Sequence, residues 1–464
     1  MNKFFEAFAN IFRVPDLRKR LLFTMGMLAV YRLGGHIPTP GINTDKLASF
    51  FDQQRGTVLG FIDLFSGGQM RRLTVFALGI MPYITASIIL QLMTVVYEPL
   101  AKLQKEGELG RKKITQWTRY LTLLLSAVQS LGIAITLERQ GDFVRNPGVG
   151  FVLMTMLTLT AGSVFVMWLG EQITDRGVGN GMSLLIFAGI VVGLPRGVAD
   201  LWDKVQNQAW GAFTVPAILL LILIMVAVVA FIVYVERSER RIPVQYAKRV
   251  VGRKVVGGQS THLPLRVNSG GVMPVIFASS VLTLPQTLGQ FFKDNRYIKP
   301  MFDALKWGEP LYTLLYAVGI IFFAYFYVSI VFNPTEVADN MRKYGGFIPG
   351  IRPGARTANY INEILTRITL VGALYLILIS IIPEWMIAGL HLNHLWLVGG
   401  FFERLPTWVT NGLNVNFYFG GTSLLIVVGV AMDTVNQIES QLIMRHYEGF
   451  TPRSGKVRGR KATW

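Results

Sequence analysis

The sequence predicts an all-α integral membrane protein with ten transmembrane helices in two pseudo-symmetric inverted five-helix halves, plus one short helix that does not span. Three observations lead to this fold class. Hydrophobic residues make up 52% of the 464 residues and charged residues only 16%, against about a quarter in soluble domains. Long apolar runs follow one another along the chain, and one motif occurs twice.

The apolar runs define the predicted spans. A helix needs about 20 apolar residues to cross the hydrocarbon core of a bilayer. Runs near this length give ten spans, numbered here in chain order: 18–35, 73–97, 116–137, 150–170, 182–200, 213–235, 271–292, 311–332, 367–388 and 417–435.

The basic residues indicate the orientation of these spans. The net charge is +18, and Lys and Arg gather in alternate connections: at 18–20, 102–113, 236–270 and 333–366, and in the tail after 450. Loops rich in Lys and Arg stay in the cytoplasm. We therefore expect both termini and all basic loops to be cytoplasmic, which only an even number of spans permits.

The segment 389–416 tests this count, because it contains several apolar residues after the ninth span. His391, His394, Glu403 and Arg404 interrupt it, and an eleventh span would place the basic tail outside. We expect an external loop with an amphipathic helix at the membrane interface, its Trp side chains at headgroup depth.

An internal repeat divides the chain into two halves. Residues 79–90 (GIMPYITASIIL) open span 2, and residues 271–282 (GVMPVIFASSVL) open span 7. Because each half has five spans, an odd number, the second half, 201–464, enters the membrane upside down relative to the first, 1–200. Inverted repeats place the functional site between the halves, often where Pro or Gly interrupts matching helices. Pro82 and Pro274 form such a pair.

Several kinds of chemistry are excluded. Cysteine is absent, and the span interiors hold almost no ionisable residue, Arg32 near one end of span 1 being the nearest case. Ion-coupled transporters usually carry intramembrane Asp, Glu or His. The segment 177–181 (GVGNG) lacks the strand and Lys of a phosphate loop and predicts a tight turn. We therefore expect no enzyme activity, no cofactor and no metal site.

The remaining features suggest a constriction and docking loops. Ile80, Ile84 and Ile276 lie beside the repeated Pro residues, and a ring of bulky aliphatic side chains excludes ions by dewetting. The segment 57–68 predicts a short amphipathic helix, either a stopper folded into the bundle or a helix at the interface. The basic loops 236–270 and 333–366 contain turn formers and Pro, which suits an acidic or nucleic-acid-bearing partner.

At this point the sequence resembles the SecY family, the central subunits of bacterial protein translocases. The resemblance runs almost from end to end. It is carried by residues 76–84 (FALGIMPYI), 168–177 (WLGEQITDRG), 259–265 (QSTHLPL), 350–354 (GIRPG) and 417–426 (FYFGGTSLLI).

The resemblance implies a protein-conducting channel of the bacterial inner membrane with an hourglass pore. It implies a pore ring of Ile80, Ile84, Met182, Ile186, Ile276 and Ile426. It implies a plug at Phe61, Ile62, Leu64 and Phe65, and a lateral gate between spans 2 and 7 at Thr85, Ser87, Gln91, Ser279 and Ser280. Partner docking falls on Arg253, Lys254 and Arg352. Met is flexible, so Met182 predicts a softer seal than the Ile that this position usually carries.

The same resemblance implies the partners and leaves two competing functions. The partners are the small subunits SecE and SecG, the SecA motor ATPase, the ribosome, polypeptides that bear signal sequences, and the lipid bilayer. A secondary transporter is the first alternative, because inverted repeats are common there. A membrane insertase that passes helices only sideways is the second.

Overall fold

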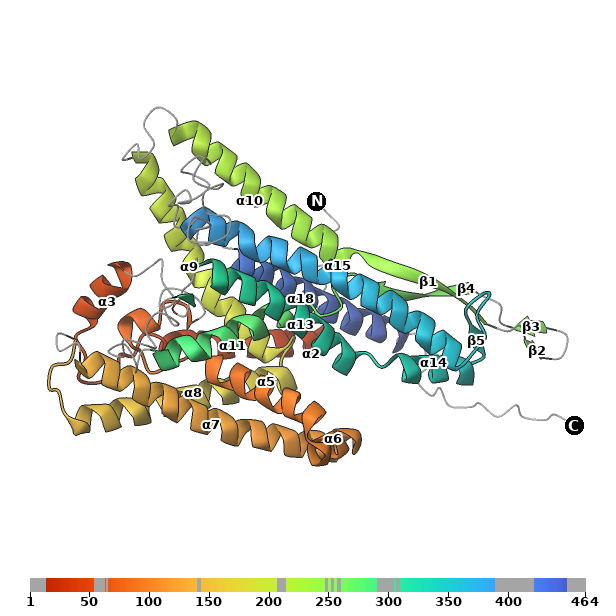
Figure 1. Ribbon diagram of the computed structural model, residues 1–464, viewed down its shortest axis with the longest axis horizontal. Coiled ribbons are helices and arrows are strands. Elements are labelled where there is room, and N and C mark those ends of the chain that lie inside the picture. Colours follow the sequence, from red (N-terminus) through yellow and green to blue (C-terminus); the bar gives the residue numbers. More distant parts are fainter. Residues whose placement is uncertain are drawn as a thin grey trace, which may run out of the picture.

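The computed structural model describes residues 14–53, 63, 66–139, 143–206, 214–246, 249–251, 254–256, 260–289, 304–305, 309–388 and 421–448. Helices dominate this part of the chain (Figure 1). The helices are α2 (Pro15–Gly34), α3 (Thr44–Gln53), the 3-10 helix η1 (Met70–Arg72), α5 (Met81–Val96), α6 (Glu98–Lys105), α7 (Glu108–Arg139), α8 (Val149–Arg176), α9 (Gly181–Gln206), α10 (Thr214–Arg237), α11 (Met273–Gly289), α13 (Pro310–Val331), α14 (Pro334–Lys343), α15 (Ala355–Ala388) and α18 (Gly421–Glu448).

Each predicted span falls on one of these helices. In chain order they are α2, α5, α7, α8, α9, α10, α11, α13, α15 and α18. Within the described residues, five helices are long and apolar enough to cross a membrane, or six when the bent pair α5 and α6 is counted as one span. The predicted tight turn at 177–181 is also present, because α8 ends at Arg176 and α9 begins at Gly181.

The second span differs from its prediction at its start, whereas its end at Val96 agrees with the predicted 97. Residues 73–80 form turns, and the helix starts only at Met81. At its other end the chain bends by 104° into α6. Tyr97 has an extended backbone there, and Pro99 lies in the first turn of α6. Pro has no N–H to donate to the preceding turn, so α5 cannot continue through it.

Strands occupy one of the two predicted docking loops and part of the other, which the sequence analysis did not foresee. In the loop between α10 and α11, β1 (Glu239–Tyr246) pairs antiparallel with β4 (Ser260–Arg266), from Glu239 opposite Arg266 to Gln245 opposite Ser260. Two shorter strands, β2 (Arg249–Val251) and β3 (Lys254–Val256), pair beyond them. The short β5 (Gly346–Phe347) of the next loop adds to the free edge of β1.

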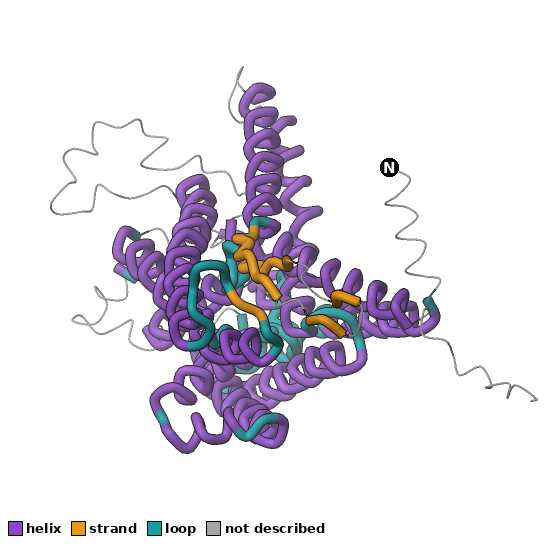
Figure 2. Tube along the Cα trace, turned by 90° about the vertical axis from the view of Figure 1, so that its right-hand side faces the viewer, coloured by secondary structure: helices purple, strands orange, loops and turns teal. Residues whose placement is uncertain are grey.

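All these strands lie at one end of the bundle, called here the sheet end (right in Figure 1), and α14 lies there too. Seen from the sheet end, the strands stand in front of the helices (Figure 2). A cluster of buried side chains that includes Ile242, Leu265 and Ile361 joins the sheet to α13, α14 and α15. The sheet is thus anchored to the bundle by its own apolar core.

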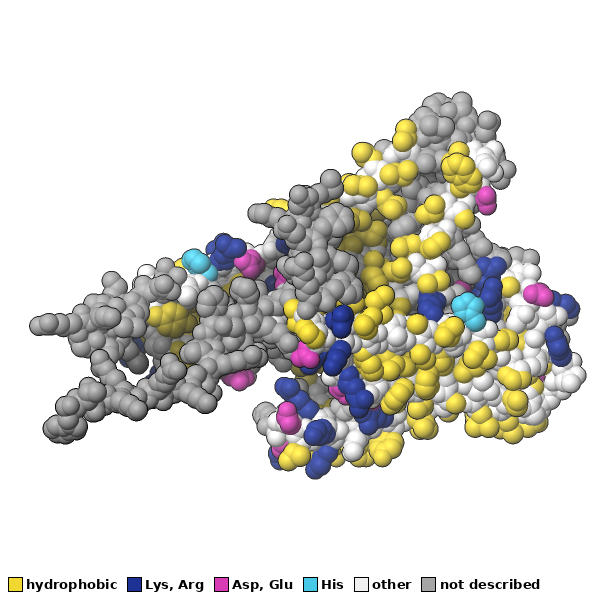
Figure 3. All heavy atoms as spheres, turned by 180° about the vertical axis from the view of Figure 1, so that it is seen from behind, with side chains coloured by type: hydrophobic (Ala, Val, Ile, Leu, Met, Phe, Trp, Pro, Cys, Tyr) yellow, Lys and Arg dark blue, Asp and Glu magenta, His cyan; other side chains and the backbone are white. Residues whose placement is uncertain are grey.

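The outer face of the bundle is suited to lipid. Hydrophobic side chains cover its middle when it is viewed from behind, whereas Lys and Arg gather over α6 and the start of α7 (Figure 3). Large apolar side chains such as Leu157, Leu223 and Leu314 are more than half exposed. In water this exposure would be unfavourable, and in a bilayer it is what a spanning helix requires.

Candidate functional site

The residues predicted to form the pore ring all belong to the large apolar core of the bundle or pack against it. They come from segments far apart in sequence: Ile80 directly precedes α5 and Ile84 lies in it, α9 supplies Met182 and Ile186, α11 supplies Ile276, and α18 supplies Ile426. The five Ile side chains are buried, with exposed fractions between 1% and 7%, and belong to one apolar cluster. Met182 is half-buried and packs against the same cluster. These residues from both halves therefore share one apolar core, in which α5 contacts α11 and α9 contacts α18.

The position of Met182 depends on a glycine in the neighbouring helix. A Cβ atom at Gly170 of α8 would lie 2.4 Å from the Met182 sulfur. The absence of a side chain at Gly170 thus provides the space that Met182 fills. Met182 and Ile186 lie on the same face of α9, because residues four apart in a helix are neighbours on its surface.

The two copies of the repeated motif have the same local structure. Gly79 and Gly271 both have left-handed backbones, with φ of +54° and +57°. Each glycine N–H donates to a carbonyl three residues earlier, Gly79 to Phe76 at 2.8 Å and Gly271 to Asn268 at 3.3 Å. A left-handed turn strongly favours Gly, which is the physical reason that the motif carries it twice.

The repeated prolines do not interrupt helices, contrary to our expectation. Pro82 and Pro274 are the second residues of α5 and α11. Pro is tolerated in the first turn, because the N–H it lacks would have no intrahelical partner there. Each Pro therefore helps to start its helix just after the Gly turn.

The helices of the predicted lateral gate, α5 and α11, contact each other. Thr85, Ser279 and Ser280 are buried. The Thr85 hydroxyl donates to Met81 O at 3.0 Å, the Ser280 hydroxyl to Ile276 O at 2.7 Å, and Gln91 Nε2 to Ser87 Oγ at 3.3 Å. These three hydrogen bonds stay within one helix each, so they do not have to break when α5 and α11 separate.

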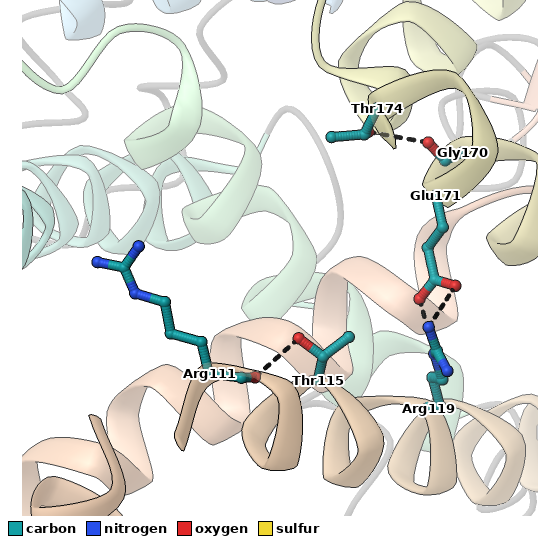
Figure 4. A network of polar contacts seen from close by, with 6 residues as sticks. All are labelled: Arg111, Thr115, Arg119, Gly170, Glu171 and Thr174. Carbon is teal, nitrogen blue, oxygen red and sulfur yellow. Dashed lines mark hydrogen bonds and ion pairs between the residues drawn. The ribbon is translucent and has the colours of Figure 1, made fainter. Parts of the chain in front are cut away.

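One ion pair joins α7 to α8 beside the site (Figure 4). Arg119 lies 2.9 Å from each oxygen of Glu171, through Nε to Oε1 and Nη2 to Oε2. This two-point geometry fixes the relative rotation of the helices better than a single contact does. Three residues after Glu171, the Thr174 hydroxyl donates to Gly170 O and accepts from the Gly181 N–H, both at 2.9 Å. That second bond closes the turn between α8 and α9.

A second polar contact, which the sequence analysis missed, joins the end of α10 to the turn between β4 and α11, at the base of the β1–β4 hairpin (called here the docking hairpin). Asn268 is buried and donates through Nδ2 to Glu236 Oε1 at 2.7 Å and to Gly271 O at 3.1 Å. Glu236 lies just beyond the predicted span 213–235. Burial raises the pKa of its carboxyl, and the charge of Asp433 raises it further, whereas the Asn268 hydrogen bond opposes both. No pattern in the sequence pointed to this contact, because Glu236 and Asn268 are 32 residues apart.

The predicted plug and docking residues are described only in part. Phe61, Ile62, Leu64, Phe65 and Arg253 lie outside the described residues, as does the loop 389–416. Lys254 begins β3. Arg352 is exposed, and its carbonyl accepts a hydrogen bond from the Thr357 hydroxyl at 3.1 Å.

Comparison with known proteins places this arrangement in a family. The SecY family model matches residues 74–435. Two curated relatives are named protein translocase subunit SecY. The one from Vibrio cholerae is 48% identical over 442 residues, covering 94% of both chains, and the one from Escherichia coli K12 is 48% identical over 439 residues, covering 93% of both.

The chain belongs to the SecY family. Membership confirms the predicted function, a protein-conducting channel, and fits the ten-span membrane architecture.

Solved structures agree on the fold. A structure described as that of a protein-conducting channel matches 93% of this chain and 94% of its own, with a TM-score of 0.63 at 16% identity. Sec61 in a canine ribosome–channel complex from the endoplasmic reticulum matches the same shares with a TM-score of 0.58 at 16% identity. At these identities the likeness extends to the SecY fold alone.

Proposed function

We propose that this chain is the passive pore through which unfolded polypeptides cross the bacterial inner membrane and from which helices enter it sideways. The observation that supports this most is that Ile80, Ile84, Ile186, Ile276 and Ile426, which are far apart in the sequence, are all buried in one apolar core cluster. Bulky aliphatic side chains around a constriction exclude water and ions at rest. They also spread around a larger solute without breaking hydrogen bonds.

The resting seal combines this ring with the plug. Phe61, Ile62, Leu64 and Phe65 supply the plug, which follows α3 and precedes the turn into α5. A signal sequence opens the channel by entering between α5 and α11. The contact between these helices and the hydrogen bonds of Thr85, Ser280 and Gln91 within single helices support this gate.

The halves 1–200 and 201–464 form the two sides of this gate. The matched Gly79 and Gly271 turns support a common origin for them. In the membrane, the sheet end faces the cytoplasm together with both termini. The gathering of Lys and Arg over α6 and the start of α7 supports this orientation.

The energy for transport comes from partners, because the pore does no covalent chemistry and uses no cofactor. We assign Arg253, Lys254 and Arg352 to the docking of the SecA motor and the ribosome, and SecE and SecG to the same membrane complex. The paired β1 and β4 strands support this assignment, because they hold the loop out from the sheet end as a shaped element. Sec61, a structural neighbour, is in a ribosome–channel complex.

A single-cysteine experiment tests the pore. The chain has no cysteine, so one variant carries Ile276→Cys in the cluster and another Leu219→Cys, at a position that is 64% exposed on α10. A secretory polypeptide with one cysteine is stalled during transport with the partners bound. We expect it to form a disulfide at position 276 and not at 219.

The other outcomes separate the competing functions. Cross-linking at neither position, with the substrate engaged, would overturn the polypeptide pore in favour of a transporter. Cross-linking at 219 alone would favour an insertase that passes helices only along its outer surface.

A further inference from the structure

Arg32 brings a positive charge into the helix bundle next to the constriction. It lies near the end of α2, is half-buried, and donates through Nη2 to the carbonyl of Ala188 and, at 3.4 Å, to that of Gly189. Both carbonyls belong to α9, two and three residues after Ile186 of the pore cluster. A charged side chain within a membrane bundle is costly to bury and generally has a function.

A tight turn at residues 66–68 lies next to Arg32 and α9. Gly67 and Gly68 both have left-handed backbones, with φ of +74° and +78°. The Gly68 N–H donates to Asp63 O at 2.8 Å, a bond across five residues of the kind that left-handed glycines make. The Ser66 hydroxyl also donates to Asp63 O, at 3.0 Å. The turn therefore has a defined shape.

This turn is packed against both α9 and Arg32. A Cβ atom at Gly67 would lie 2.9 Å from Cα and O of Gly189 and 3.1 Å from Nη2 of Arg32. Only glycine fits a backbone contact this close. The guanidinium thus lies where three separate elements meet: α2, the 66–68 turn and α9.

We propose that Arg32 is a positioning residue that ties the 66–68 turn and α9 together in the resting channel and so keeps the pore closed to ions. Its donors are fixed in a planar fork, so one side chain reaches two neighbouring carbonyls while resting against Gly67. The ammonium of Lys is a compact point charge on a flexible stem and reproduces this only in part. The inference rests on the proposed pore.

The test measures ion conductance of the full-length chain, assembled with its small subunits in planar bilayers without a substrate. Arg32→Met keeps the length of the side chain and removes its donors. We expect resting conductance to rise about tenfold, as loss of one hydrogen bond to a charged group would shift the closed–open equilibrium. Arg32→Lys should restore part of the seal. Arg139→Met, the same change at an exposed position of α7, should leave conductance unchanged.

A second pair of variants separates this contact from a general loss of structure. Gly67→Ala places a methyl group against Gly189 and should raise resting conductance as well. The double variant with Arg32→Met should leak no more than the leakier single variant, because both changes break one contact. Additive leaks would overturn the assignment, because they would show two independent defects. If Arg32→Met fails to assemble, Arg32→Lys and Gly67→Ala decide by the same comparison.

Ile84→Asn distinguishes failure of this inference from failure of the proposed pore. If Ile84→Asn leaks and the Arg32 and Gly67 variants stay sealed, Arg32 does not position the turn and the pore stands. If none of these variants raises the resting conductance, Ile84 does not form part of a constriction. The proposed pore ring and the inference about Arg32 are then both wrong.

Discussion

At the residue scale, the seal depends on side chains that are apolar and buried together. Ile84 is 7% exposed and Ile276 is 2% exposed, and they reach one cluster from α5 and α11. Replacing both with Asn keeps four non-hydrogen atoms in each side chain and introduces amide groups that bind water. Each Ile contributes about 1.5–3 kcal/mol through burial. We expect the resting conductance of the reconstituted channel to rise at least about tenfold, since about 1.4 kcal/mol already gives that factor.

Leu219→Asn is the matched control for this prediction. Leu219 is 64% exposed on the outer face of α10, so the same chemical change occurs away from the cluster. Its conductance should equal that of the unmodified chain. Unchanged conductance in Ile84→Asn/Ile276→Asn, with the protein assembled, would remove these residues from the ring.

At the element scale, glycine allows α8 to approach the segment that leads into α5. A Cβ atom at Gly162 would lie 1.9 Å from the backbone oxygen of Val75, and the next residue, Ser163, donates to Gly79 O at 3.3 Å. Gly162→Ala must push the two backbones apart. We expect it to lower the free energy of unfolding by about 1–3 kcal/mol, the usual cost of overpacking, which thermal unfolding in detergent measures.

Gly26→Ala provides the comparison for that variant. Gly26 also lies in a predicted span, within α2, but a Cβ atom there would have nothing within 4 Å. The change should be neutral or stabilising by up to about 1 kcal/mol, because Ala favours helix more than Gly does. Equal thermal stability of the two alanine variants would show that the α8 contact carries no strain.

The docking hairpin gives a second prediction at this scale. Lys254 begins β3, beyond the paired strands β1 and β4. Reversing Arg253 and Lys254 to Glu exchanges attraction for repulsion toward an acidic partner while leaving the bundle intact. We expect binding of the motor and of ribosomes, measured by co-sedimentation, to weaken about tenfold at low salt and less at high salt. Normal binding, or loss of the folded bundle, would contradict the assignment.

The elements also show how far sequence reasoning extends. Hydropathy located all ten helices, because a span must be apolar over most of its length. It did not foresee β1 and β4, because the alternation of Ile242 and Val244 in β1 is short and stands among Arg, Pro and polar residues, which marked the segment as a basic loop. It misread Pro82 and Pro274 as interruptions, because where a helix starts depends on the Gly turn before it. The roles of Gly162, Asn268 and Arg32 could not be predicted, because each depends on contacts with residues distant in the sequence.

At the scale of the whole molecule, the distribution of charge sets the orientation in the membrane. The net charge of +18 comes from 45 Lys and Arg against 27 Asp and Glu, and the basic residues gather in alternate loops. The predicted orientation places the sheet end in the cytoplasm. The connection between α7 and α8 then lies outside the cell, since a single spanning helix separates it from the basic start of α7.

Two single-cysteine variants test this orientation. Thr261→Cys is at an exposed position of β4, and Asn146→Cys is at an exposed position between α7 and α8. A membrane-impermeant maleimide should label position 146 in intact spheroplasts and position 261 only in inside-out vesicles. The cysteine-free parent, labelled in parallel, defines the background. Labelling of both positions from the same side would contradict the alternation of the spans. Labelling of each from the opposite side would keep the alternation and invert the molecule, so the sheet end could not meet a cytoplasmic motor.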